Sequence, residues 1–459
     1  MKSKAPWQLL SLLLIGTFMG TLGNSMVSIA LPTLKDHFSV SLTSAVWSIT
    51  LYTLTFSVLM PIFSVLGPSI GIKRLYIGGM CFVGIGSILS VTAANFGVFI
   101  AARVLTGIGV GTFLPSIMWV ITNKFEPEFQ GRATGFWALV NSFGHAIGPT
   151  LSGFLLQIFD WRALFFINVP LAILCIGLSI KVFPDDQRLP MKKFDTAGAV
   201  ALALLAFSTM LLITYAIKQG IDSPQSLILL ACVVISIAFI LLYERKQTAP
   251  FVDLSLFTNK KYLASVVAIS TQSFAQFGLL VSLPVFLIDV NHVTQQSAGL
   301  LVMSMTLMMA LISPVSGKLS DEWGSRRVCW LGILLIGLGA LSFLLLHINN
   351  ISGNFILSFI GGLLILGAGF GFIQSASTVS VIHAVPQEKA GAATGFFHMI
   401  RFINASLGST VFGIILETNS KGLTGGYFQG FSIILILSII ALPVMFWIAE
   451  KKRVPVPST

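Results

Sequence analysis

The chain contains one long apolar segment twice. Residues 131–153 (GRATGFWALVNSFGHAIGPTLSG) align without a gap to residues 391–413 (GAATGFFHMIRFINASLGSTVFG) at a constant offset of 260, and eight of the 23 positions are identical. Several of the identical positions are glycines. Small residues let helices in a bilayer approach closely, so the repeated pattern indicates the same packing in two places. Two equivalent membrane halves are typical of a transporter.

A second match supports this interpretation. Residues 61–79 align with residues 314–332 at an offset of 253, only seven residues different from the first. Chance similarity between apolar segments would explain either match alone, but it would not keep nearly one register across a whole half.

Hydropathy predicts an all-α integral membrane protein. Of the 459 residues, 55% are hydrophobic and only 9% are charged. Counting apolar stretches of about 18 residues or more as membrane spans gives fourteen. They are 7–32, 44–67, 75–94, 97–122, 131–158, 162–183, 196–217, 225–243, 262–287, 297–317, 327–347, 355–380, 390–417 and 427–449.

The basic residues follow a membrane topology. A net charge of +11 in a soluble protein would suggest nucleic acid, but with the N-terminus placed inside, 21 of the 27 Lys and Arg residues fall at cytoplasmic positions. The positive-inside rule therefore predicts a multi-pass protein of the cytoplasmic membrane with both termini in the cytoplasm, and no nucleic-acid partner. The first apolar stretch is too long for a signal-peptide core, and we expect an uncleaved helix.

The offsets also predict the domain organisation. Two adjacent six-helix halves would place equivalents about 180 residues apart, by the usual span and loop lengths, so about 70 residues have been inserted. We expect a six-helix half at 1–183, an inserted two-helix segment with its linkers at 184–250, and a second six-helix half at 251–459.

The chain resembles the major facilitator superfamily, specifically its branch of fourteen-helix drug:proton antiporters. The resemblance covers nearly the whole length and is carried by the order and spacing of short motifs. These are LGNSMVSIALPTL (22–34), Arg103 with Gly107, Gly109 and Gly111, GHAIGPTLSG (144–153), DWRALFFINVP (160–170), FDTAG (194–198), PFVDLSLF (250–257) and GKLSDEWGSRR (317–327).

Two departures from that pattern concern charge. Where the branch usually has an Asp in the first helix, this chain has Gly23 beside Asn24. In the first cytoplasmic loop the expected Asp is replaced by Pro68, whereas the second copy keeps Asp321. We therefore expect a one-sided cytoplasmic latch, formed by Gly317, Asp321, Gly324, Arg326 and Arg327.

Few residues with charge or titratable side chains lie deep in the predicted spans, and none is acidic. Charged residues near the bilayer centre are costly, so they commonly have a function. The resemblance implies proton transfer, or a hydrogen-bond network to the first helix, for Arg103; bonding to backbone carbonyls is the structural alternative. His145 can exchange a proton near neutral pH, or simply pack between helices. The proton-coupling candidates are therefore Arg103 and His145, and the substrate-cavity candidates are Asn24, Trp137, Asn141, His398 and Arg401.

A second set of residues in the fifth span is predicted to control how this helix packs on its neighbours. Small residues permit tight helix contact, and a proline bends the helix so that the contact can change between states. This conformational motif consists of Gly144, Gly148, Pro149 and Gly153.

The sequence thus predicts a transporter rather than an enzyme. We expect a monomeric, proton-coupled exporter of amphipathic small molecules in a lipid bilayer, without cofactor or metal. A dedicated exporter of one metabolite or lipid on the same fold is the first alternative. A membrane enzyme or receptor is the second, but no catalytic pair or ligand cluster supports it. The four cysteines, Cys81, Cys175, Cys232 and Cys329, have no paired spacing and are expected to pack as small apolar residues.

Overall fold

The computed structural model describes residues 4–183, 195–247, 251, 254–348, 355–419 and 422–448, and all regular structure in these ranges is helical. The all-helical prediction is confirmed for this part of the chain. The first helices are α1 (Lys4–Phe38), α2 (Leu42–Ile70), α3 (Ile72–Val91), α4 (Phe96–Lys124), α5 (Pro127–Ile158), α6 (Ala163–Phe166) and α7 (Asn168–Val182).

The remaining helices follow the residues outside the described ranges. They are α8 (Thr196–Gln219), α9 (Pro224–Tyr243), η1 (Glu244–Lys246), α10 (Ser255–Thr258), α11 (Lys260–Val285), η2 (Phe286–Val290), α12 (Gln295–Trp323), α13 (Ser325–Ile348), α14 (Phe355–Ala384), α15 (Gln387–Thr418), α16 (Gly422–Val444) and η3 (Met445–Trp447).

Thirteen helices in the described residues are long and apolar enough to cross a membrane. The predicted spans match them within a few residues, and the one expected at 162–183 corresponds to Ala163–Val182, in which Ile167 separates α6 from α7. Helix α5 is not among the thirteen. Its glycines, Asn141 and His145 lower its hydropathy, and it packs on α1 and α12 inside the bundle.

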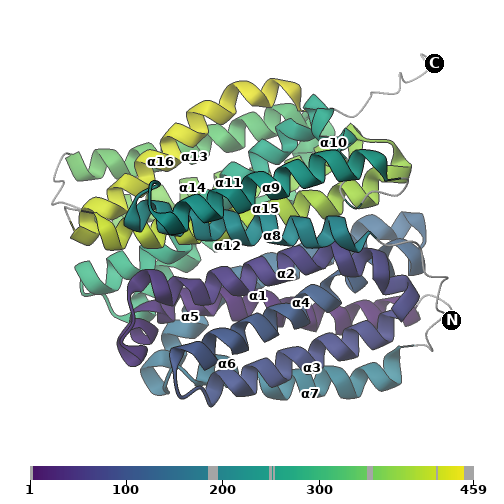
Figure 1. Cartoon of the computed structure of the whole chain (residues 1–459), viewed down its shortest axis with the longest axis horizontal. Helices are drawn as coiled ribbons and strands as arrows, with labels where there is room; N and C mark the ends of the chain where they lie inside the picture. Colours follow the sequence, from purple (N-terminus) through teal and green to yellow (C-terminus); the bar gives the residue numbers. More distant parts are fainter. Residues whose placement is uncertain are drawn as a thin grey trace.

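One packing pattern occurs twice. In the first part of the chain, α1 packs on α5, α4 packs on both α2 and α3, and α3 packs on α7. In the last part, α11 packs on α15, α14 packs on both α12 and α13, and α13 packs on α16. Figure 1 shows these two groups as two layers of roughly parallel rods. They meet along two seams, α5 against α12 and α2 against α15.

The tight turns at Gly71 and Gly324 repeat as well. Gly71 separates α2 from α3 with φ 109° and ψ 128°, and Gly324 separates α12 from α13 with φ 88° and ψ 142°. A side chain rarely tolerates such a positive φ, so glycine is required at both turns. The two positions are 253 residues apart, which is the offset of the second sequence match.

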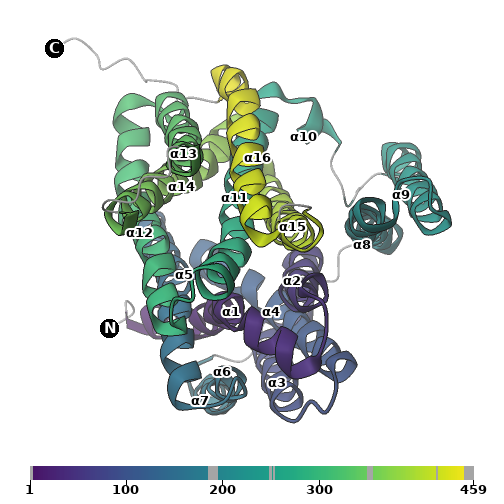
Figure 2. The same ribbon diagram turned by 90° about the vertical axis from the view of Figure 1, so that its left-hand side faces the viewer.

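Helices α8 and α9 stand apart from both groups. They pack on each other, and Figure 2 shows them at one side of the bundle, next to α2 and α15. Ala206 and Met210 of α8 are buried together with Leu54 and Val58 of α2, and Leu407 of α15 packs against the same cluster. The pair therefore covers one of the two seams, while the α5–α12 seam has no such cover in the described residues.

Candidate functional site

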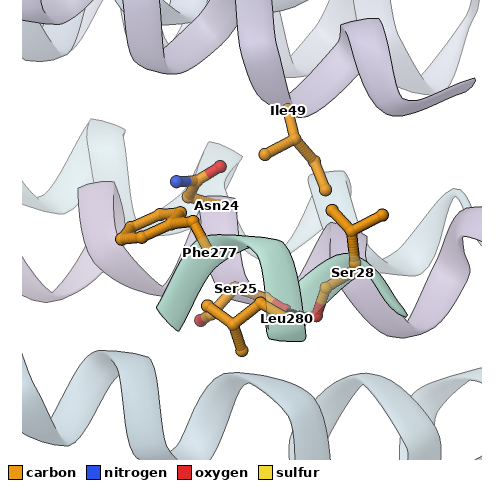
Figure 3. A pocket seen from close by; sticks show the side chains of 7 residues that line it. Asn24, Ser25, Ser28, Ile49, Phe277 and Leu280 are labelled. Atoms are coloured by element: carbon orange, nitrogen blue, oxygen red, sulfur yellow. Dashed lines mark hydrogen bonds between the residues drawn. The ribbon is translucent and has the colours of Figure 1, made fainter. Parts of the chain in front are cut away.

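A small pocket lies between α1, α2 and α11. Figure 3 shows Asn24, Ser25 and Ser28 of α1 facing Phe277 and Leu280 of α11 across it, with Ile49 of α2 nearby. The volume inside it that a water molecule can occupy is about 10 Å³, which is room for about one water. In this conformation the pocket is therefore closed to a drug-sized molecule and would have to widen to bind one.

Asn24 brings polar chemistry to this pocket. Its Nδ2 donates a hydrogen bond of 3.2 Å to Thr53 Oγ1 of α2, whereas its buried Oδ1 has no partner. A buried carbonyl oxygen without a donor is costly, because it has lost its water. A substrate that brings a donor into the pocket would satisfy it.

His145 joins this pocket to the centre of the bundle. The imidazole is 3% exposed, and its ring centroid lies 5.8 Å from that of Phe277, which lines the pocket. Nδ1 of His145 is buried without a hydrogen-bond partner. The charge of Arg401 acts electrostatically on His145 and on His398, so α5 and α15 contribute to one polar cluster.

Arg401 is the centre of that cluster. Its guanidinium is 3% exposed, donates 3.0 Å from Nη2 to Oε1 of Gln374 in α14, and lies 5.2 Å from the Phe402 ring centroid. The Nε of Arg401 is buried without an acceptor. Trp137 of α5 contacts His398 at 6.3 Å between ring centroids. The structure thus brings Arg401, His398, His145 and Trp137 together from both sides of the bundle.

Asn141, the repeat counterpart of Arg401, is also buried. Within the described residues no contact joins it to Arg401 or to the Asn24 pocket, so its place in the substrate cavity stays a prediction.

Arg103 has a different environment. Its Nε donates 3.1 Å to the carbonyl oxygen of Ser48, and its guanidinium carbon lies 4.3 Å from the ring centroid of Tyr52. Tyr52 in turn donates 2.7 Å to the Gly20 carbonyl, so the network reaches α1. These contacts agree with two of the expectations for Arg103, namely bonding to a backbone carbonyl and a hydrogen-bond network that reaches the first helix. Among the described residues no direct contact joins Arg103 to Arg401, and only the ring contacts of Tyr52 with Phe56 and of Phe56 with Phe402 connect their surroundings.

The motif of α5 makes close contacts in two directions. A Cβ on Gly148 would collide with Oγ of Ser25 in α1 and lie 2.8 Å from its Cβ. Gly144 meets Thr21 of α1 in the same way. A Cβ on Gly153 would collide with the Gln295 carbonyl oxygen of α12 and lie 2.9 Å from the carbonyl carbon. Small residues are therefore required on both faces.

Pro149 contributes to the second contact. Its carbonyl oxygen would lie 2.5 Å from a Cβ on Gly299 of α12, and Thr150 Oγ1 donates 3.3 Å to the carbonyl of that glycine. The α5–α12 seam is thus closed by backbone against backbone in this conformation.

More polar contacts between the two groups of helices gather at one end, where α1 ends and α2 begins. We call this the outer end, because the topology expected from the basic residues would place it outside the cell. Lys35 of α1 lies 3.6 Å from Asp289 of η2. Glu417 of α15 accepts 2.7 Å from the backbone N–H of Thr43 in α2 and 3.0 Å from Nζ of Lys218 in α8. The outer end is therefore closed.

The predicted cytoplasmic latch lies partly outside the described residues, because the side chain of Asp321 is not described. Gly324 makes the turn between α12 and α13, Arg326 is half-buried and Arg327 is exposed. A Cβ on Gly317 would meet no atom within 4 Å. The latch stays a prediction.

The sequence reasoning missed three glutamines. Gln374 is the hydrogen-bond partner of Arg401. Gln272 and Gln276 of α11 are fully buried, and one hydrogen bond joins them while Oε1 of Gln272 and Nε2 of Gln276 stay unpaired. The signal for these residues in the sequence is a side-chain amide within an otherwise apolar span, and it is weaker than that of a charged residue because an amide is neutral.

Comparison with known proteins defines the class. The family model of the Major Facilitator Superfamily matches residues 13–409, and the chain belongs to this superfamily of membrane transporters. It is 29% identical over 452 residues to the riboflavin transporter RibZ of Clostridioides difficile, covering 98% of this chain and 95% of that protein. It is 28% identical over 412 residues to the multidrug resistance protein Stp of Mycobacterium tuberculosis H37Rv, covering 89% and 76%.

Solved structures show the same fold at low identity. A bacterial homolog of the human lysosomal transporter Spinster, in an inward-facing and unoccupied conformation, matches with a TM-score of 0.68 and 15% identity, covering 97% of each chain. A peptide transporter, POT, in complex with sulfate matches with a TM-score of 0.71 and 14% identity, covering 96% of this chain and 95% of that one.

Proposed function

We propose that this protein is a proton-coupled secondary exporter of amphipathic small molecules, that is, a multidrug efflux transporter. The observation that carries the proposal is the cluster around Arg401 and His145, which has buried, unpaired polar atoms next to the apolar wall of Phe277. Apolar surface with a few polar groups suits amphipathic ligands. The relative Stp, named a multidrug resistance protein, agrees with this choice.

The proposed mechanism is alternating access in the cytoplasmic membrane. It uses fourteen spans, with α5 as the fifth, arranged as two six-helix halves and the inserted pair α8–α9. The repeated packing pattern and the paired turns at Gly71 and Gly324 support this layout. The halves would rock about the central cluster and expose it first at one end of the bundle and then at the other. The positive-inside bias supports two cytoplasmic termini.

A dedicated exporter of one metabolite is the second candidate, favoured by the similarity to a riboflavin transporter over nearly the whole chain. A growth-inhibition panel in cells with and without the gene separates the two. A multidrug exporter should raise the tolerated concentration of several unrelated amphiphiles, whereas a dedicated carrier should change none of them and instead release one metabolite into the medium.

Proton coupling is tested at His145. We expect His145→Gln to abolish substrate-induced proton movement in proteoliposomes, measured with a pH-sensitive dye, because glutamine keeps hydrogen bonding but cannot take up a proton. The exposed His383 on α14 offers a matched control, and His383→Gln should leave proton movement unchanged. Intact coupling in His145→Gln would make His145 structural and move the proton site to an acid at a helix end, such as Asp36 or Asp289.

A further inference from the structure

Arg401 is a buried cation without a counter-charge. No Asp or Glu oxygen lies within 4.0 Å of its guanidinium in the described part of the chain, and its hydrogen-bond acceptor, the Gln374 amide, is neutral. Arginine carries five N–H donors, and here the buried Nε–H has no acceptor. A buried charge is tolerated when a partner compensates it, so this site lacks the group that it is shaped to bind.

The charged residues around the cluster point to an anion rather than a cation as that group. The acidic residues described in the spans lie at the ends of the helices, where Asp289 forms an ion pair with Lys35 and Glu417 forms one with Lys218. The titratable groups near Arg401 are His145 of the neighbouring α5 and His398 of the same helix, α15, and neither carries a negative charge. The repeat position in α5 is the neutral Asn141.

The neighbouring pocket determines what else the ligand contains. The His145 ring contacts Phe277, and beyond it Ile49 and Leu280 form an apolar wall that ends at the unpaired Oδ1 of Asn24. An apolar body with one acidic end matches the chemistry of these surfaces, provided that the pocket widens as the halves move.

Resting on the proposed export function, we propose that Arg401 binds the carboxylate of amphipathic acids and makes the transporter selective for them. The two oxygens of a carboxylate can accept two parallel N–H bonds from the planar guanidinium group. Such bidentate pairs are stronger than hydrogen bonds between neutral groups. Gln374 positions the fork, and the apolar wall takes the body of the substrate. Neutral molecules of the same shape bind more weakly, and permanent cations are disfavoured.

The test compares an acid with its neutral isostere on the purified full-length protein. Binding of 2-naphthoate and of 2-naphthamide is measured by calorimetry for the unmodified protein, for Arg401→Gln and for Arg401→Lys. We expect the unmodified protein to prefer the acid at least about tenfold, and Arg401→Gln to weaken acid binding about 10- to 100-fold, the range of a charged hydrogen bond. Amide binding should change less than about threefold on the same scale, and Lys should restore only part of the preference.

Arg162→Gln is the matched control, because it removes a partly exposed arginine from the outer end without touching the cluster. It should keep the acid preference. The proposal is overturned if the unmodified protein shows no preference for the acid, or if Arg401→Gln retains that preference. It is also overturned if Arg401→Gln weakens the binding of both ligands equally and lowers the thermal midpoint, because Arg401 would then only stabilise the packing of its helix. Strong gradient-driven export of a dicationic biocide by the unmodified protein would overturn it too.

The two proposals fail separately. Proteoliposomes with an imposed pH gradient report transport of both ligands. If the amide is pumped as well as the acid, export stands and the anion site falls. If the acid binds through Arg401 but neither ligand moves, the anion site stands and the proposed export function falls.

Discussion

Arg103 and Arg401 are both buried arginines in membrane helices, and their surroundings differ in kind. Arg103 is 1% exposed, donates to a backbone carbonyl of α2 and lies over Tyr52. Arg401 is 3% exposed and has a side-chain amide as its acceptor. Each guanidinium keeps one buried nitrogen without an acceptor, Nη2 of Arg103 and Nε of Arg401. The difference lies in the partners: a fixed backbone carbonyl and an aromatic ring for Arg103, and a side-chain amide that can rearrange for Arg401. Burial of a charge alone therefore does not identify a binding site; the nature of its partners does.

Position in the bundle reinforces the contrast. The contacts of Arg103 stay within the helices of one packing group, since Phe165 of α6 lies 5.6 Å from its guanidinium carbon. Arg401 acts on His145, which belongs to the other group. A residue of the first kind stabilises one half in every conformation, whereas a residue of the second kind lies where the halves move against each other.

The strongest test of this contrast is Arg103→Ala. We expect it to lower the free energy of unfolding by about 3 kcal/mol, since it removes a charged hydrogen bond and a buried cation–π contact and leaves a cavity. Export of acidic and neutral substrates should fall together. The measurements are the thermal midpoint in detergent and transport of both substrate classes. Loss of one class at an unchanged midpoint would show that Arg103 binds substrate.

The same distinction applies to the glycines of α5, with a smaller expected effect. Gly148→Ala should cost about 1–3 kcal/mol of stability, because it overpacks the contact with Ser25 inside one half. Gly153→Ala should instead weaken the closed α5–α12 seam by a similar amount, and so slow transport about tenfold.

Thermal midpoints and cysteine accessibility at the outer end distinguish the two glycine variants. We expect a lower midpoint for Gly148→Ala and greater labelling for Gly153→Ala. Identical behaviour in both assays would remove the division between contacts inside a half and contacts across the seam.

The smallest effect is expected for a charge that already has its partner. Glu417→Gln removes the ion pair with Lys218 but keeps an acceptor for the Thr43 N–H. The two side chains are about 30% exposed, so the pair contributes less than about 1 kcal/mol. We expect the outer end to open up to about fivefold more often, measured by the same labelling. A block of transport would show that this contact controls opening and is not a minor support.

Much of the fold was predictable from the sequence, because a bilayer leaves the backbone few choices. Backbone groups in lipid must bond within the helix, so long apolar stretches are helical wherever they occur. The internal match at an offset of 253 predicted equivalent segments, and the structure places the glycine turns Gly71 and Gly324 at matched positions within them. The span expected at 162–183 was found at Ala163–Val182, but its division at Ile167 into α6 and α7 was not predicted, since apolar composition continues across it.

The candidate site was only partly predictable. The sequence by itself determined that Arg103, His145, His398 and Arg401 are the cationic or potentially cationic residues deep in apolar spans, because such a residue in an apolar stretch is visible at once. Only the tertiary structure decided that Arg103 donates a hydrogen bond to the Ser48 carbonyl and that Arg401 donates one to the Gln374 side chain. The physical reason is that hydropathy records how apolar a helix is, whereas a partner depends on how each helix is rotated and which neighbour it meets.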